Sequence, residues 1–174
     1  ATRLPGKPLL KINNLSIISH VVKKAKKTKI GRVIVCTEDQ LILDDVIKNG
    51  GEAILTRNSH KSGTDRIFEA YKKLNIKNVD YILNLQGDEP AIDENDIINL
   101  NNMMIKTNSN IGTMGAEIKN QNFFSNENIV KVKTEENLNK KNFLKFEDFF
   151  RIGNTDDILN IYHHVGIYIF RPNS

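Results

Sequence analysis

Short apolar runs alternate with amphipathic segments along the first half of the chain, and this alternation limits the possible folds most strongly. Apolar residues recur at helical spacing over residues 16–28, which predicts an amphipathic helix. The further elements expected in this half are a strand at 32–37, a helix at 39–48, a strand at 52–56, a helix from about residue 65 and a strand at 79–85. This order favours a doubly wound α/β fold with a mostly parallel sheet.

The second half of the chain has a looser pattern. It predicts a helix at 93–106, strands at 111–118, 129–133 and 162–170, and loops at 135–142 and 153–157. Neither loop is long enough for an interdomain linker. The 174 residues suit one domain, residues 1–174, that carries a small inserted β region.

Composition excludes several classes of function. The net charge is +4, but the lysines are spread along the chain without an aromatic-rich basic stripe, so we expect no nucleic-acid partner. No apolar run approaches the about 18 residues of a membrane helix, so we expect no membrane insertion. The single cysteine, Cys36, lies in an apolar run and suits a core thiol in a reducing cytoplasm.

An acidic segment, Gln86-Gly87-Asp88-Glu89-Pro90, follows the strand at 79–85. Ligands of open α/β sheets bind beyond the carboxyl ends of the strands, and a carboxylate there can hold a hard divalent cation against phosphate oxygens. Asp88 is therefore the leading candidate for a metal ligand. The alternative is a simple turn, because these residue types favour turns.

The start of the chain is a cationic loop. Arg3 and Lys7 stand in a segment that Pro5, Gly6 and Pro8 keep from becoming helical. Arginine can bind phosphate oxygens bidentately, and lysine acts as a mobile point charge. Together with Asp88, the loop supplies the charges that nucleotidyl transfer needs; alone, it would suit an exposed basic turn.

A second anion site is expected where Ser62 and Gly63 precede a helix for which Thr64 is a plausible N-cap. Free backbone N–H groups at such a helix start can bind an anion, and Arg66 in the first turn could add a charged fork. Ordinary helix capping is the alternative explanation of this segment.

Four ordered segments resemble the bacterial 3-deoxy-manno-octulosonate (Kdo) cytidylyltransferase family, also called CMP-Kdo synthetase. They are residues 2–9, 60–66, 86–90 and 164–168, and the resemblance covers nearly the whole chain. It implies a Rossmann-like nucleotidyltransferase fold and a Mg²⁺-dependent reaction of CTP with Kdo that gives CMP-Kdo and pyrophosphate for lipopolysaccharide. It also implies a cytoplasmic homodimer.

The resemblance also assigns roles to residues of this chain. Lys7 and Asp88 are expected to be catalytic, and Asp88 is expected to hold the metal. The expected nucleotide-binding residues are Arg3, Lys7, Ser62, Gly63 and Arg66. The expected sugar-binding residues are Gln86, His164 and Tyr168, although a histidine or tyrosine on an apolar strand is more often part of the core.

The chain departs from the family pattern in three places. The family's first strand is absent, and so is a C-terminal portion with a second metal-binding aspartate, so we expect a domain that is incomplete at both ends. Residues 144–151 lack the family's substrate-binding arginine, whose role Arg151 could take over. Two other functions therefore stay open: activation of another acidic sugar such as a sialic acid, and noncatalytic nucleotide binding.

Overall fold

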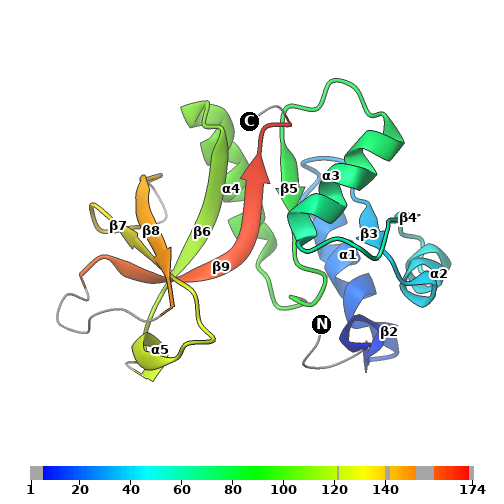
Figure 1. Cartoon of the computed structure of the whole chain (residues 1–174), viewed down its shortest axis with the longest axis horizontal. Helices are drawn as coiled ribbons and strands as arrows, with labels where there is room; N and C mark the ends of the chain where they lie inside the picture. Colours follow the sequence, from blue (N-terminus) through cyan, green and yellow to red (C-terminus); the bar gives the residue numbers. More distant parts are fainter. Residues whose placement is uncertain (1–5, 121, 140–141, 152–158, 173–174) are drawn as a thin grey trace.

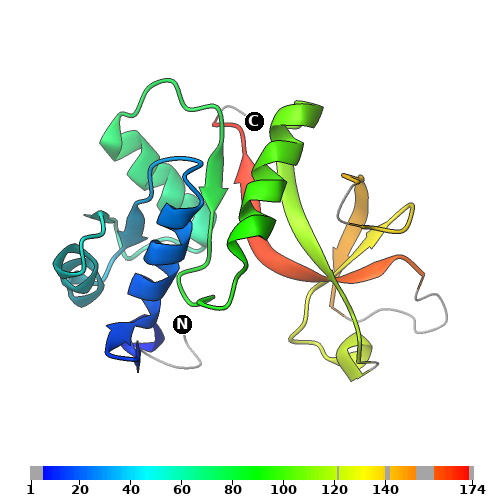
Figure 2. The ribbon, with the colours of Figure 1, turned by 180° about the vertical axis from the view of Figure 1, so that it is seen from behind.

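The computed structural model describes residues 6–120, 122–139, 142–151 and 159–172. In Figure 1 the helices α1, α2 and α3 gather on one side of the molecule, and the strands β6 to β9 form a curved sheet on the other. Helix α4 lies between these two parts, as the reverse view in Figure 2 also shows. No helix among the described residues is long and apolar enough to cross a membrane.

The first part of the chain forms the helical side. Its elements are a 3₁₀ turn η1 (Lys7–Leu9), strands β1 (Lys11–Ile12) and β2 (Leu15–Ser16), helix α1 (Ile17–Lys27), strand β3 (Val35–Thr37), helix α2 (Gln40–Lys48), strand β4 (Ala53–Leu55) and helix α3 (Gly63–Leu74). The predicted helices and strands of this half are confirmed, with shorter strands than expected. The small β1–β2 hairpin was not predicted.

The second part forms the curved sheet. Its elements are β5 (Ile82–Asn84), α4 (Glu94–Thr107), β6 (Ile111–Glu117), α5 (Asn122–Ser125), β7 (Lys131–Thr134), β8 (Phe146–Phe150) and β9 (Ile161–Phe170). Sequence reasoning missed β8, which lies in the segment that departs from the family pattern. The expected loop at 153–157 falls outside the described residues.

Strand β9 pairs with three of the other strands of the five-stranded curved sheet. One of its edges pairs with β6 along nearly all its length, from Glu117 opposite Tyr162 to Ile111 opposite Phe170. Its other edge pairs with β7 at residues 161–163 and with β5 at residues 168–170. All these pairings are antiparallel.

The expectation of a mostly parallel sheet is wrong for the described residues. Their one parallel pairing joins β3 to β4, and the five-stranded sheet is antiparallel throughout. The physical reason is that β9 runs beside β5 in the opposite direction, whereas a parallel neighbour would have to be connected to β5 through a crossover helix. In addition, β3 and β5 do not pair with each other, and residues of both line a cavity of about 690 Å³. The architecture remains α/β, with mixed and divided sheets.

Two apolar clusters stabilise the two sides of the molecule. On the helical side, Ile18 and Val22 of α1 pack with Val46 of α2. On the sheet side, Leu100 and Met104 of α4 pack against Ile167 and Ile169 of β9. The helical spacing of the α4 pair and the alternation of the β9 pair are the patterns that bury one face of each element.

Four α-helices begin with a side-chain cap. The capping residues are Ser16 for α1, Asp39 for α2, Ser62 for α3 and Asp93 for α4. Each accepts a hydrogen bond from a backbone N–H of the first turn, which replaces a missing intrahelical partner. The expectation that Thr64 caps α3 is therefore wrong: the helix begins two residues earlier than expected, at Gly63, and Ser62 accepts from the amide of Asp65 at 3.1 Å.

Replacing Met104 by alanine should lower the free energy of unfolding by about 2–5 kcal/mol, because Met104 is fully buried and the change leaves a cavity between α4 and β9. The neighbouring Ile105, which is 60% exposed, provides the control variant Ile105→Ala. Urea unfolding followed by circular dichroism measures both. Equal losses for the two variants would contradict the placement of this core.

Candidate active site at the end of strand β5

A cation and a carboxylate meet where strand β5 ends. Lys7 Nζ donates to Asp88 Oδ2 at 2.8 Å, and each side chain is about one third exposed. The hydrogen bond and charge of Asp88 raise the pKa of Lys7, so the lysine stays a cation. The structure thus brings the basic loop and the acidic segment together at Lys7, and the roles expected of Lys7 and Asp88 stay predictions. Arg3 lies outside the described residues.

The acidic segment is both a turn and part of this site. The amide of Glu89 donates to the Gln86 carbonyl at 3.4 Å, which closes the chain over residues 86–89. A Cβ atom on Gly87 would lie 2.8 Å from Ile18 Cδ1, so glycine lets the turn pack closely on α1. The turn thereby fixes Asp88 beside Lys7 in η1.

Asp88 provides one oxygen donor group for a metal. Within the described part of the chain, no group of three or more His, Cys, Asp or Glu side chains could hold an ion. One carboxylate fits a Mg²⁺ ion that keeps several waters and takes its other ligands from substrate phosphates. It does not form a metal cage made only of protein.

The start of helix α3 adjoins the end of β5. A Cβ atom on Gly63 would lie 3.7 Å from Asn84 Nδ2, which places the two segments side by side. Ser62 and Gly63 are both exposed. Ser62 is committed to the cap of α3, because its Oγ both accepts from the Asp65 amide and donates to the Asp65 carboxylate at 2.7 Å.

Arg66, in the first turn of α3, is held by side chains that follow two of the strands. Its guanidinium pairs with Glu38, which follows β3, and donates to Thr56 Oγ1 at 2.7 Å, which follows β4. Its side chain is 17% exposed. Residues just beyond the carboxyl ends of β3 and β4 thus meet at the start of α3, which also adjoins the last residue of β5, as expected for an α/β site.

The cavity between β3 and β5 reaches this region. Its lining includes Cys36, Gly63, Arg66, Asn84 and Gln86. Burial raises the pKa of the Cys36 thiol to about 11, so the side chain is a neutral thiol at physiological pH. The prediction of a core thiol agrees with this neutral, partly buried state.

Strand pairing brings the three sugar-site candidates together. Asn84 pairs with Tyr168, and a Cβ atom on Gly166 would lie 3.5 Å from Gln86 Cγ, so Gln86 lies over β9. The rings of His164 and Tyr168 are 5.1 Å apart between centroids. Sequence reasoning placed Gln86, His164 and Tyr168 in one pocket, and the structure places them in one cluster.

His164 has a defined protonation state within this cluster. The hydroxyl of Thr113 donates its single proton to the Ile167 carbonyl at 2.6 Å, so its oxygen accepts from His164 Nε2 at 2.8 Å. Burial, reinforced by the charge of His163, lowers the pKa of His164. The imidazole is therefore neutral at pH 7 and carries its proton on Nε2.

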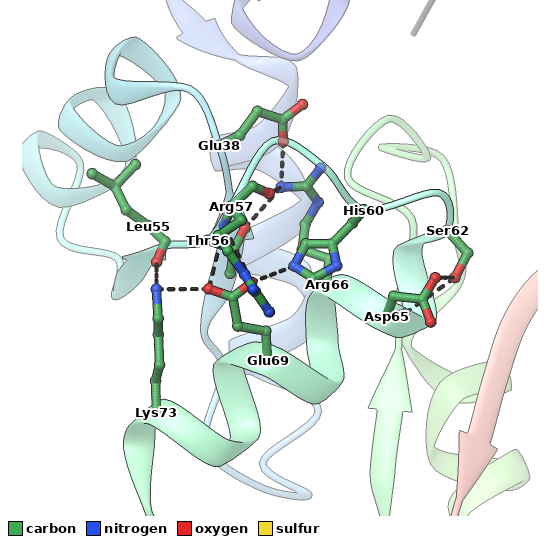
Figure 3. A network of polar contacts seen from close by, with 10 residues as sticks. All are labelled: Glu38, Leu55, Thr56, Arg57, His60, Ser62, Asp65, Arg66, Glu69 and Lys73. Carbon is green, nitrogen blue, oxygen red and sulfur yellow. Dashed lines mark hydrogen bonds and ion pairs between the residues drawn. The ribbon is translucent and has the colours of Figure 1, made fainter.

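Several residues of this region could not be found from sequence patterns. Thr113 lies on β6 and reaches His164 only through the pairing of β6 with β9. Glu69 is buried on α3 and accepts from His60, Arg57 and Lys73 (Figure 3). The only sequence signal for Glu69 was its position one helical turn after Arg66.

Arg151 donates to the Glu127 carbonyl at 3.0 Å, so its guanidinium is bound to the segment between α5 and β7.

Comparison with known proteins decides the family. A family model described as cytidylyltransferase matches residues 1–174. The 3-deoxy-manno-octulosonate cytidylyltransferase of Thermodesulfovibrio yellowstonii is 40% identical over 97% of this chain and 70% of the relative. The enzyme of the same name from Nitrobacter winogradskyi is also 40% identical, over 98% of this chain and 67% of the relative. The chain belongs to the CMP-Kdo synthetase family.

A solved structure supports this membership at the level of the backbone. A CMP:2-keto-3-deoxy-manno-octonic acid synthetase complexed with CTP is 32% identical and superimposes with a TM-score of 0.85, over 99% of this chain and 70% of that one. An apo UDP-glucose pyrophosphorylase, at 12% identity and a TM-score of 0.68, shares the fold. The nucleotidyltransferase fold expected from the sequence is thus confirmed.

The buried His164 should make the stability of this family member fall in mild acid. Its pKa is lower in the folded chain than the ordinary value of about 6.5, so only the unfolded state takes up this proton at first as the pH falls. The free energy of unfolding therefore keeps its full value when the pH is above about 6.5, and it declines as the pH falls below that point. Urea unfolding between pH 8 and pH 5 should show a smaller decline for His164→Gln than for the wild type.

The matched control is His20→Gln, which changes a histidine on α1 outside the sheet. If His164→Gln and the wild type lose stability in parallel over this pH range, a neutral buried His164 is excluded.

Proposed function

We propose that the protein is a cytidylyltransferase that transfers CMP from CTP to Kdo and releases pyrophosphate. The main support is the contact between Lys7 and Asp88 beside the cluster of Gln86, His164 and Tyr168, in a member of the CMP-Kdo synthetase family. A phosphate-binding cation, a metal-binding carboxylate and a polar sugar pocket are the three parts that such a reaction requires.

The reaction is a direct displacement. The anomeric hydroxyl of Kdo attacks the α-phosphorus of CTP and loses its proton to water as the new O–P bond forms, while the bond from the α-phosphorus to the bridging oxygen breaks and pyrophosphate leaves. No covalent enzyme intermediate is required, so positioning and charge neutralisation provide most of the catalysis. Lys7, which remains a cation beside Asp88, is placed to neutralise the triphosphate, and Arg3 has the same proposed role.

The proposed cofactor is Mg²⁺, for which Asp88 is the protein ligand in this chain. Bound Mg²⁺ would supply charge neutralisation on phosphate oxygens. Asp88 would then hold the ion in place of Lys7, so Lys7 is expected to turn from Asp88 toward the phosphates when nucleotide binds. Ser62, Gly63 and Arg66 complete the proposed nucleotide site at the start of α3.

The sugar site is proposed at the cluster on β9. Gln86 offers an amide with both donors and an acceptor, and it is exposed beside Gly166. His164 and Tyr168 present neutral polar groups, because burial also raises the pKa of the Tyr168 hydroxyl. We further propose a cytoplasmic homodimer, which sedimentation of the purified protein would test.

The intact protein should release pyrophosphate from CTP only when Kdo or a closely related sugar acid is present. The reason is that Gln86 offers amide donors to a sugar carboxylate, in the same turn as the Asp88 that contacts the Lys7 cation. A coupled pyrophosphate assay with Kdo, a sialic acid and a neutral hexose measures the preference. Preference for the sialic acid would favour the first alternative function, and CTP binding without turnover of any sugar would favour a noncatalytic module.

Asp88→Asn should reduce kcat by roughly a hundredfold or more while leaving the fold intact, because it removes the charge that holds the metal but keeps the size of the side chain. The control is Asp80→Asn, an exposed aspartate just before β5, at the opposite end of the same strand. Activity near that of the wild type at saturating Mg²⁺ would refute the metal assignment.

A further inference from the structure

A buried carboxylate lies outside the residues assigned to substrate. Glu69 is in the second turn of α3, and its side chain is 8% exposed. It accepts from Lys73 Nζ at 2.7 Å, from His60 Nε2, and from the backbone amide and Nε of Arg57 at 3.2 and 3.3 Å. Figure 3 shows these donors around the one carboxylate. The bond from Lys73, followed by those from His60 and Arg57, holds the pKa of Glu69 well below its usual range.

Two of these donor residues, Arg57 and His60, belong to the loop that leads into the proposed nucleotide site, whereas Lys73 lies on α3 itself. This loop, residues 57–62, connects β4 to α3. Glu69 binds the first residue of the loop through the Arg57 amide and the middle of the loop through the His60 side chain. Ser62 fixes its last residue by capping α3. The loop is therefore attached to the helix at three points, two of which depend on Glu69.

Glu69 is also connected to Arg66 through the backbone of Arg57. The Arg57 amide donates to Glu69, and the Arg57 carbonyl accepts from Arg66 at 3.4 Å. The preceding residue, Thr56, accepts from Arg66 as well. Glu69 and Arg66, one turn apart on α3, thus both bind the short segment at residues 56–57. A change at Glu69 would loosen Arg57 and the adjacent Thr56, which are two of the acceptors of the Arg66 guanidinium, and leave the pair with Glu38 as the third contact.

We propose that Glu69 is a positioning residue for the nucleotide site, which fixes the 57–62 loop so that Ser62, Gly63 and Arg66 are ordered before CTP binds. This inference rests on the proposed function. Glu69 acts through the loop and does not touch the nucleotide, since its oxygens are occupied by protein donors and a free carboxylate would repel a triphosphate. An ordered loop lowers the entropy that binding would otherwise cost.

The test compares Glu69→Gln with the wild type in the intact protein. Glutamine keeps the size of the side chain, but its amide group would place donor hydrogens against the donors of Lys73, His60 and Arg57. CTP affinity should fall roughly tenfold, the size expected when the ligand must order about one more backbone residue. Calorimetric titration with CTP alone measures this, and steady-state kinetics give KM for CTP and for the sugar separately.

The matched control is Glu52→Gln. Glu52 is also an ion-paired glutamate, with Arg32 as its partner, but it is partly exposed at the start of β4, away from the 57–62 loop. Its variant should bind CTP as the wild type does. His60→Gln gives a second, milder variant, which removes the middle attachment of the loop and retains the Arg57 and Lys73 contacts. It should weaken CTP binding severalfold.

The outcomes separate the inference from the proposed function. A higher KM for CTP with an unchanged KM for the sugar and a nearly unchanged kcat supports a positioning role. Unchanged CTP affinity in folded Glu69→Gln overturns it, as does equal weakening of CTP and sugar binding. If Glu69→Gln does not fold, unchanged CTP affinity in His60→Gln overturns it instead. A wild type that does not bind CTP would refute the proposed function itself.

Discussion

The pairing of β9 with both β5 and β7 is the interaction on which the rest of the structure depends. β9 carries the buried face against which α4 packs, and it closes the sheet by contact with β6 along its other edge. Between its two partners on the first edge, residues 164–167 have no strand beside them in the β5 and β7 ladders. Gln86 reaches Gly166 at this interval. The change of partner thus creates the place where the sugar-site candidates gather.

The extent to which the sequence predicted the fold differs between the two halves. Helices α1 to α4 have clear apolar periodicity and side-chain caps, and they were predicted within a few residues. The direction of strand pairing was not predictable, because an apolar run such as residues 79–85 looks the same in a parallel and an antiparallel sheet. β8 was missed because its Phe and acidic residues do not alternate cleanly over residues 146–150.

The candidate site was predicted where contacts follow local sequence or a family motif. Lys7 and Asp88 are far apart in the chain, and the expectation that they meet came from complementary chemistry at strand ends. The contacts of Thr113 with His164 and of Glu69 with Arg57 depend on tertiary packing, and neither residue type suggests a site by itself. Buried polar groups need partners, but the sequence does not state which partner the fold provides.

The hydrogen bond from His164 to Thr113 has a consequence for recognition. Since the ring proton lies on Nε2, the other ring nitrogen, Nδ1, presents a lone pair. A histidine in this state distinguishes ligands by polarity: it attracts hydroxyl or amide hydrogens and disfavours a carboxylate oxygen. The Thr113 hydroxyl and the Ile167 carbonyl therefore set which ring nitrogen of His164 donates and which accepts, and so fix the polarity of this buried ring on β9.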